Sequence, residues 1–174
     1  MENPTQIIES GGKKYLLTWI RDDDVSKYAP LAHVHGIVFN EKDEILIGRS
    51  KPTSSWKIMG GRSEEGETIE QTLSRELMEE GDITVSKIYP LGVQKVEVIE
   101  GKEKDDDPYY QVRCVALLDE LLPQTPDPAP GQGLVWERKF VPMRDITTYI
   151  LWGENGAAMF EEAIKLYEKI RQKV

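Results

Sequence analysis

The sequence predicts one α/β domain with a mixed β-sheet and about two main helices. Short apolar runs typical of strands alternate with two longer segments of helical periodicity. The 174 residues suit a single domain with its own core. Hydrophobic residues are 39% and charged residues 30%, as in globular proteins. Residues 1–174 are therefore expected to form one unit, with residues 1–28 as an N-terminal extension that contains an extra strand.

The strand pattern fixes the expected order of the sheet elements. Strands are expected at residues 13–20, 31–39, 44–47, 91–100, 109–117 and 134–141. A turn at 40–43 joins two of them as a hairpin, and a charged tip at 101–107 joins two others. Helices are expected at 68–80 and 156–172, and the Pro/Gly-rich residues 122–133 form a long surface loop.

Composition limits the partners. The formal net charge of -9 argues against binding to a nucleic-acid duplex, although it allows a small phosphate ligand if carboxylates gather cations. No apolar run approaches the roughly 20 residues of a membrane span. The N-terminus lacks the features of a signal peptide, and the single cysteine, Cys114, lies in an apolar strand pattern. We therefore expect a cytoplasmic protein with a structural cysteine.

The helix at 68–80 carries acidic residues beside its apolar face. Its apolar stripe consists of Ile69, Leu73 and Leu77. On a helical wheel Glu76 and Glu80 lie within about 20° of Ile69, and Glu79 lies on the flank of the stripe. Partly buried carboxylates cost several kcal/mol each unless a partner compensates. A solvated helix with salt bridges is the alternative, but Arg75 is the only basic residue within the helix.

Divalent cations are the natural compensation. Mg²⁺ takes oxygen ligands from one or two carboxylates and from substrate phosphates. The glycines before the helix support this interpretation, because Gly60 and Gly61 allow the backbone to approach a ligand closely. Gly66 permits a tight turn, and Glu67 lies just before the helix, where its dipole favours a carboxylate.

Taken together, these residues resemble a known signature. The pattern consists of Gly61, five residues, Glu67, seven residues and then Arg75-Glu76-Leu77-Met78-Glu79-Glu80. It resembles the signature of the Nudix hydrolases. That family cleaves nucleoside diphosphates linked to another moiety. The resemblance implies an α/β/α sandwich with the mixed sheet between helices. It also implies an Mg²⁺- or Mn²⁺-dependent pyrophosphohydrolase whose partner is a small nucleotide diphosphate.

The resemblance assigns roles to individual residues. The implied metal ligands are Glu76, Glu79, Glu80 and the carbonyl oxygen of Gly60. Arg75 is expected to orient a carboxylate, that of Glu67, by a charge-assisted hydrogen bond. A bound water attacks phosphorus, and its proton goes to a glutamate of the signature, to Asp127 or to Glu137. Arg49 and Trp56 are the candidates for contact with substrate phosphate and base.

One position departs from the family pattern. The family ends Glu-Glu-x-Gly, whereas this chain reads Glu79-Glu80-Gly81-Asp82. Because that glycine commonly ends the helix in a left-handed conformation, we expect Asp82 to adopt it.

His33 and His35 lie two residues apart on one strand, but no third ligand is nearby, so a zinc site is not expected.

Three other interpretations compete. An isopentenyl diphosphate isomerase would share the scaffold, but it uses a cysteine near the glycine loop, where this chain has Met59. A catalytically weak Nudix-like domain that binds a nucleotide as a sensor usually has eroded glutamates, and here all three are present. A purely structural acidic helix predicts indifference to Mg²⁺. The extra N-terminal strand suggests a possible homodimer.

Overall fold

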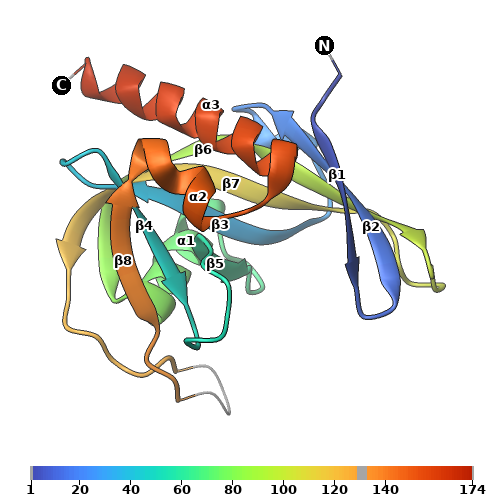
Figure 1. Cartoon of the computed structure of the whole chain (residues 1–174), viewed down its shortest axis with the longest axis horizontal. Helices are drawn as coiled ribbons and strands as arrows, with labels where there is room; N and C mark the ends of the chain where they lie inside the picture. The colour runs from blue at the N-terminus through green and yellow to red at the C-terminus, as the bar shows by residue number, and fades with distance from the viewer. Residues whose placement is uncertain (1, 129–132, 174) are drawn as a thin grey trace.

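The computed structural model describes residues 2–128 and 133–173. Within these residues a curled sheet lies between helices (Figure 1). Its strands are β1 (Thr5–Ser10), β2 (Lys13–Arg21), β3 (Leu31–Phe39), β4 (Glu44–Arg49), β5 (Met59–Arg62), β6 (Ile83–Glu100), β7 (Tyr109–Leu121) and β8 (Glu137–Pro142). Its helices are α1 (Ile69–Gly81), α2 (Ile146–Tyr149) and α3 (Gly153–Arg171), with 3₁₀ turns at Val25–Lys27 and Met143–Asp145.

The sheet is mixed, as predicted. Its strand order is β1-β2-β6-β7-β3-β4-β8, and β5 pairs with β3. β3 and β7 run parallel, whereas the other pairs are antiparallel. The N-terminal strands β1 and β2 extend the same sheet through β6, so residues of the expected extension join the main sheet.

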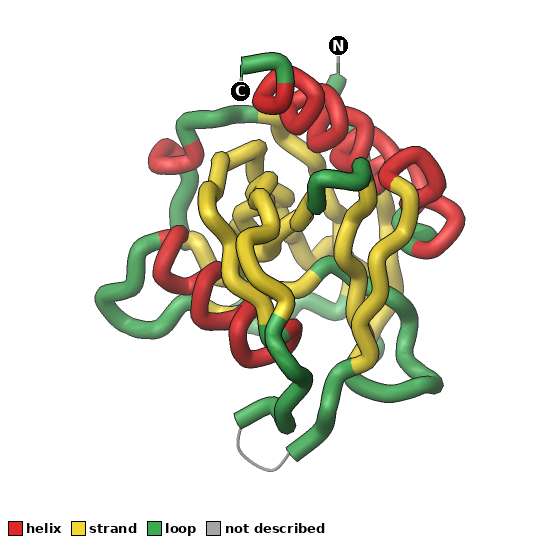
Figure 2. The backbone as a smooth tube through the Cα atoms, turned by 90° about the vertical axis from the view of Figure 1, so that its left-hand side faces the viewer, coloured by secondary structure: helices red, strands yellow, loops and turns green. Residues whose placement is uncertain are grey.

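Helices cover both faces of the sheet, which gives the α/β/α sandwich. α3 packs on one face over a core that includes Trp19, Phe39 and Phe160. α1 packs on the opposite face, where Leu73 and Leu77 are fully buried. Figure 2 shows the helices on both sides of the strands in the end-on view. The apolar layer beneath α1 holds this helix against β3, β5 and β6, and this fixes the position of the acidic helix.

Several element boundaries differ from the prediction. β6 begins at residue 83 rather than 91, β8 begins at 137 rather than 134, and α3 begins at 153 rather than 156. The polar start of β6 has no clear alternation because bulges interrupt its pairing with β7. The strands β1 and β5 were not predicted. β5 is short and glycine-containing, and β3 supplies its hydrogen bonds.

The ends of α1 agree with the sequence. Thr68 forms the N-terminal cap, and its side chain accepts a hydrogen bond from Gln71 N, which completes a capping box. Asp82 ends the helix in the left-handed region with φ 47° and ψ 48°, as expected.

Cys114 is fully buried, and burial raises the pKa of its thiol to about 12. Across the described ranges, none of the helices has the length and apolar character to span a bilayer.

Candidate active site

A cleft of about 740 Å³ lies where β5, α1 and the loop after β7 meet. Its lining includes Gly60, Gly61, Arg75, Glu76, Glu79, Glu80, Asp127 and Trp136. The structure thus brings together residues from three separate segments, among them every member of the predicted metal-ligand set. Residues 129–132 of the Pro/Gly loop lie outside the described part of the chain.

Arg75 organises the acidic residues around it. Its Nε donates to Glu67 Oε1 at 2.7 Å and its Nη2 to Oε2 at 3.0 Å, so the expected charge-assisted contact is formed at two points. Its Nη1 donates to Glu76 Oε1 at 2.9 Å and to Glu79 Oε2 at 3.3 Å. The hydrogen bonds from Arg75 and from Glu64 N lower the pKa of Glu67 to about 2. Glu67 therefore stays ionised and holds the guanidinium in place.

The carboxylate of Glu76 lies against the backbone of Gly61 in β5. A Cβ atom added to Gly61 would lie 2.4–2.5 Å from the carboxylate atoms of Glu76, so a larger residue there would force this carboxylate to move. Burial raises the pKa of Glu76, while the hydrogen bond from Arg75 opposes the shift. Close approach of backbone and carboxylate explains why a glycine stands at this offset from the helix.

Glu80 is the most buried of the three signature glutamates, with 9% of its surface exposed. Its Oε2 accepts a hydrogen bond from Gly60 N at 3.1 Å, and Lys57 Nζ lies 3.9 Å from its Oε1. Burial raises the pKa of Glu80 to about 7, although Lys57 and the Gly60 amide lower it. Gly60 itself has φ 148°, and a Cβ there would lie 2.1 Å from Val34 O. The loop conformation that presents its amide to Glu80 therefore requires glycine.

These carboxylates fit a divalent cation chemically. Glu76 and Glu80 are costly as buried anions, and a cation would relieve that cost while accepting the oxygen ligands that Mg²⁺ prefers. In the described residues no group of three or more acidic or histidine side chains converges on one point. Arg75 holds Glu76 and Glu79, whereas the Gly60 amide holds Glu80.

Asp127, from the loop after β7, also lines the cleft. The side chain is buried with 7% exposed surface, and its Oδ2 accepts a hydrogen bond from Trp136 Nε1 at 2.9 Å. Its backbone N–H donates to Leu134 O at 2.8 Å. Its charge contributes to the raised pKa values of Glu76 and Glu80. The sequence offered Asp127 only as one of several proton acceptors, and its place in the cleft depends on long-range contacts.

Asp82 anchors the loop that carries Asp127, a role that the sequence analysis missed. Its Oδ2 accepts from Thr125 N at 3.0 Å and its Oδ1 from Thr125 Oγ1 at 2.5 Å. Arg138 joins the same anchor by donating to Asp82 O at 3.1 Å and to Leu122 O at 2.5 Å. The available signal was the acidic side chain at a position where the signature has glycine. A glycine could end the helix but could not bind Thr125.

Arg49 and Trp56 lie together outside this cleft. Arg49 Nε donates to Glu137 Oε2 at 2.7 Å, and its guanidinium lies 4.3 Å from the ring centroid of Trp56. None of the three residues lines the cleft described above. Glu137 is therefore an ion-pair partner of Arg49 in this structure, and contact of Arg49 with a substrate phosphate stays a prediction.

A mixed sheet between helices, with the acidic helix α1 packed against β5, is the arrangement of a Nudix-type fold. A family model described as the NUDIX domain matches residues 29–161. The chain therefore belongs to the Nudix family.

Known relatives agree with this assignment. An oxidized purine nucleoside triphosphate hydrolase of Danio rerio is 38% identical over 87 residues, which are 46% of this chain and 56% of the relative. The match thus spans little more than half of the relative's length.

Solved structures share the fold. A Bacillus subtilis pyrophosphohydrolase has a TM-score of 0.64 at 16% identity, covering 93% of this chain and 97% of the other. A MutT protein from Bacillus halodurans has a TM-score of 0.56 at 22% identity, covering 76% and 80%.

Proposed function

We propose that this protein is a metal-dependent pyrophosphohydrolase that cleaves a diphosphate bond in a nucleotide-type substrate. Nucleoside triphosphates, nucleotide sugars, ADP-ribose and dinucleoside polyphosphates all contain this bond. The observation that carries the proposal is the buried Glu80 beside Glu76 in an open cleft, where burial raises the pKa of both carboxyls. Family membership and the name of the Danio rerio relative support the same class of reaction.

The residues of the cleft suit this chemistry. Glu76, Glu79, Glu80 and the Gly60 carbonyl would hold Mg²⁺ or Mn²⁺, which when bound supplies charge neutralisation and a more acidic water. Arg75, fixed by Glu67, orients Glu76 and Glu79. The two glycines let the phosphates approach the backbone closely.

We further assign Asp127 as the acceptor of the proton from the attacking water. It is buried in the lining of the same cleft as the glutamates, where the Trp136 indole donates to one of its oxygens. Glu137, the other candidate outside the signature, is instead paired with Arg49. A positioned carboxylate of this kind contributes about 10²–10⁴-fold to a rate.

The test is release of a mononucleotide from a panel of these substrates with Mg²⁺ or Mn²⁺. Glu79→Gln and Glu80→Gln should each lower kcat by about 10²-fold or more, because each removes a charged ligand. Glu70→Gln is the matched control, since Glu70 is exposed on the same helix. Full activity in both signature variants would refute the proposed mechanism. Tight nucleotide binding without metal or turnover would instead support a sensor.

A further inference from the structure

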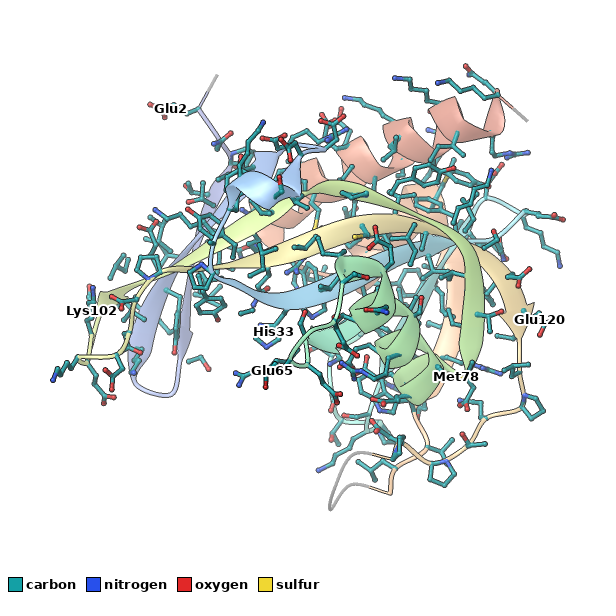
Figure 3. All side chains as sticks on the ribbon, turned by 180° about the vertical axis from the view of Figure 1, so that it is seen from behind. Glu2, His33, Glu65, Met78, Lys102 and Glu120 are labelled. Atoms are coloured by element: carbon teal, nitrogen blue, oxygen red, sulfur yellow. The ribbon has the colours of Figure 1, made fainter. Side chains whose placement is uncertain are left out.

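A second hollow of about 470 Å³ adjoins the carboxylate cleft and shares His33 and Lys57 with it. It lies between the β1–β2 hairpin and the strands β3, β6 and β7. Figure 3 shows His33 between that hairpin and the loop that carries Glu65. Its apolar walls include Tyr15, Leu17, Tyr109 and Trp152. Flat apolar walls of this kind suit a ring that stacks between side chains.

The floor of the hollow is polar and is organised by Arg113. This residue is only 3% exposed, and in the described residues all its hydrogen-bond partners are uncharged. It lies 2.9 Å from His35 Nδ1 and donates to Gln94 Oε1 and Gln111 Oε1, both at 2.7 Å. A buried guanidinium without a carboxylate is uncommon in proteins, and here it serves to orient its neighbours.

Arginine can only donate hydrogen bonds, so each atom that it contacts must accept. The Oε1 of Gln111 therefore lies against Arg113, and its amide NH₂ is the group left to donate. The same rule makes His35 a neutral ring with the proton on Nε2, since Nδ1 accepts from Arg113. Burial and the nearby Arg113 lower the pKa of His35 well below its usual value.

The amide orientation of Gln94 is fixed independently by Asn155. Asn155 Nδ2 donates to Pro4 O at 3.0 Å, so Asn155 Oδ1 must be the acceptor of that amide. Gln94 Nε2 donates to this oxygen at 2.7 Å, which again leaves Gln94 Oε1 facing Arg113. His35 and Gln111 both line the hollow with their other polar atom on Arg113, so the N–H groups left for a ligand are His35 Nε2 and Gln111 Nε2.

Because His35 and Gln111 both line this hollow, their two donors match a ring edge that carries two acceptors. A 6-oxopurine presents O6 and N7, both acceptors, along one edge, whereas a 6-aminopurine presents a donor and an acceptor there. An amino group facing a donor of the floor would leave both groups without a partner.

We propose that this hollow binds the base of the substrate and selects 6-oxopurines over 6-aminopurines, with His35 and Gln111 as the specificity-determining residues. The inference rests on the proposed function, because it assumes that a nucleotide diphosphate occupies the neighbouring cleft. Arg113 is a positioning residue that acts through these two side chains.

The experiment compares inosine triphosphate with adenosine triphosphate, a matched pair that differs at position 6. The kcat/KM for inosine triphosphate should exceed that for adenosine triphosphate by about 10-fold or more. Gln111→Glu places an acceptor where the amide donor was, and should move this ratio to one or below it. Gln111→Leu, which removes the amide donor together with the oxygen that accepts from Arg113, should lower the ratio toward one. The control Gln172→Glu, an identical change at an exposed site, should leave the ratio unchanged.

The outcomes separate the two proposals. Hydrolysis of both nucleotides at equal kcat/KM would overturn the base selectivity and leave the proposed function intact. Absence of hydrolysis of any nucleotide would overturn the proposed function. The hollow is then tested by equilibrium binding, in which tighter binding of inosine than of adenosine monophosphate supports the selectivity and equal binding overturns it. A ratio unchanged by Gln111→Leu overturns the assignment of Gln111.

Discussion

Replacing Glu80 by glutamine is expected to stabilise the metal-free protein at pH 8 but not at pH 4. The ordinary pKa of this side chain is 4.5, and burial raises it to about 7 in the folded protein. Each pH unit corresponds to about 1.4 kcal/mol, so the ionised carboxylate costs the folded state up to about 3 kcal/mol. Glutamine has no such cost, and its side-chain oxygen can still accept the hydrogen bond from Gly60 N.

The sign of the pH dependence follows from proton binding. The folded state holds the Glu80 proton more tightly than the unfolded state, so the free energy of unfolding falls as the pH rises from about 4.5 to 7. Below this window both states are protonated, and the carboxyl costs nothing. The stability difference between Glu80→Gln and wild type should therefore grow across the window and level off near pH 8.

Urea denaturation in the presence of a chelator measures this difference at pH 4 and at pH 8. The slope against urea should stay the same in all proteins, because the surface exposed on unfolding is unchanged. Glu65→Gln, an exposed carboxyl in the loop before α1, is the control and should alter stability at neither pH. A variant that is less stable than wild type at pH 8, or equally stabilised at both pH values, would refute the reasoning. Added Mg²⁺ should stabilise wild type more than Glu80→Gln.

Two further predictions concern the residues that hold the cleft together. Arg75→Lys should lower kcat by about 10²-fold, because an ammonium cannot reproduce the two-point contact with Glu67 and still reach Glu76. Steady-state kinetics measures this, and an unchanged kcat would contradict the positioning role. Asp82→Gly should keep α1 folded, because glycine accepts the left-handed conformation, but should release Thr125. Faster amide hydrogen exchange at Thr125, with kcat lowered by about 10-fold, is the expected result. Unchanged exchange at Thr125 would show that the loop is held by other contacts.

Local sequence was sufficient for the helix and its chemistry. The apolar stripe of α1 and the left-handed exit at Asp82 both follow from residues within a few positions of one another. The pair between Arg75 and Glu67, eight residues apart, was expected only from the resemblance to the Nudix signature. Periodicity also placed Glu76 and Glu80 beside the buried face, because helical geometry alone fixes that angle.

Other features needed contacts between distant segments. Local sequence does not reveal β5, because its strand hydrogen bonds come from β3 and Gly60 needs a positive φ. The donor floor of the second hollow needed Arg113 from β7 to meet His35 from β3, 78 residues away. In the sequence Arg113 is a single charge within an apolar strand and carries no sign of its partners.

The acidic helix combines both kinds of information. The sequence by itself determined that Glu76, Glu79 and Glu80 lie along one side of α1, because 3.6 residues per turn leaves no other arrangement. Only the tertiary structure decided that Glu80 is buried against Gly60 and that Asp127 lines the same cleft as the glutamates. Those two placements depend on how β5 and the loop after β7 pack against the helix. Such long-range packing has no local periodicity from which it can be predicted.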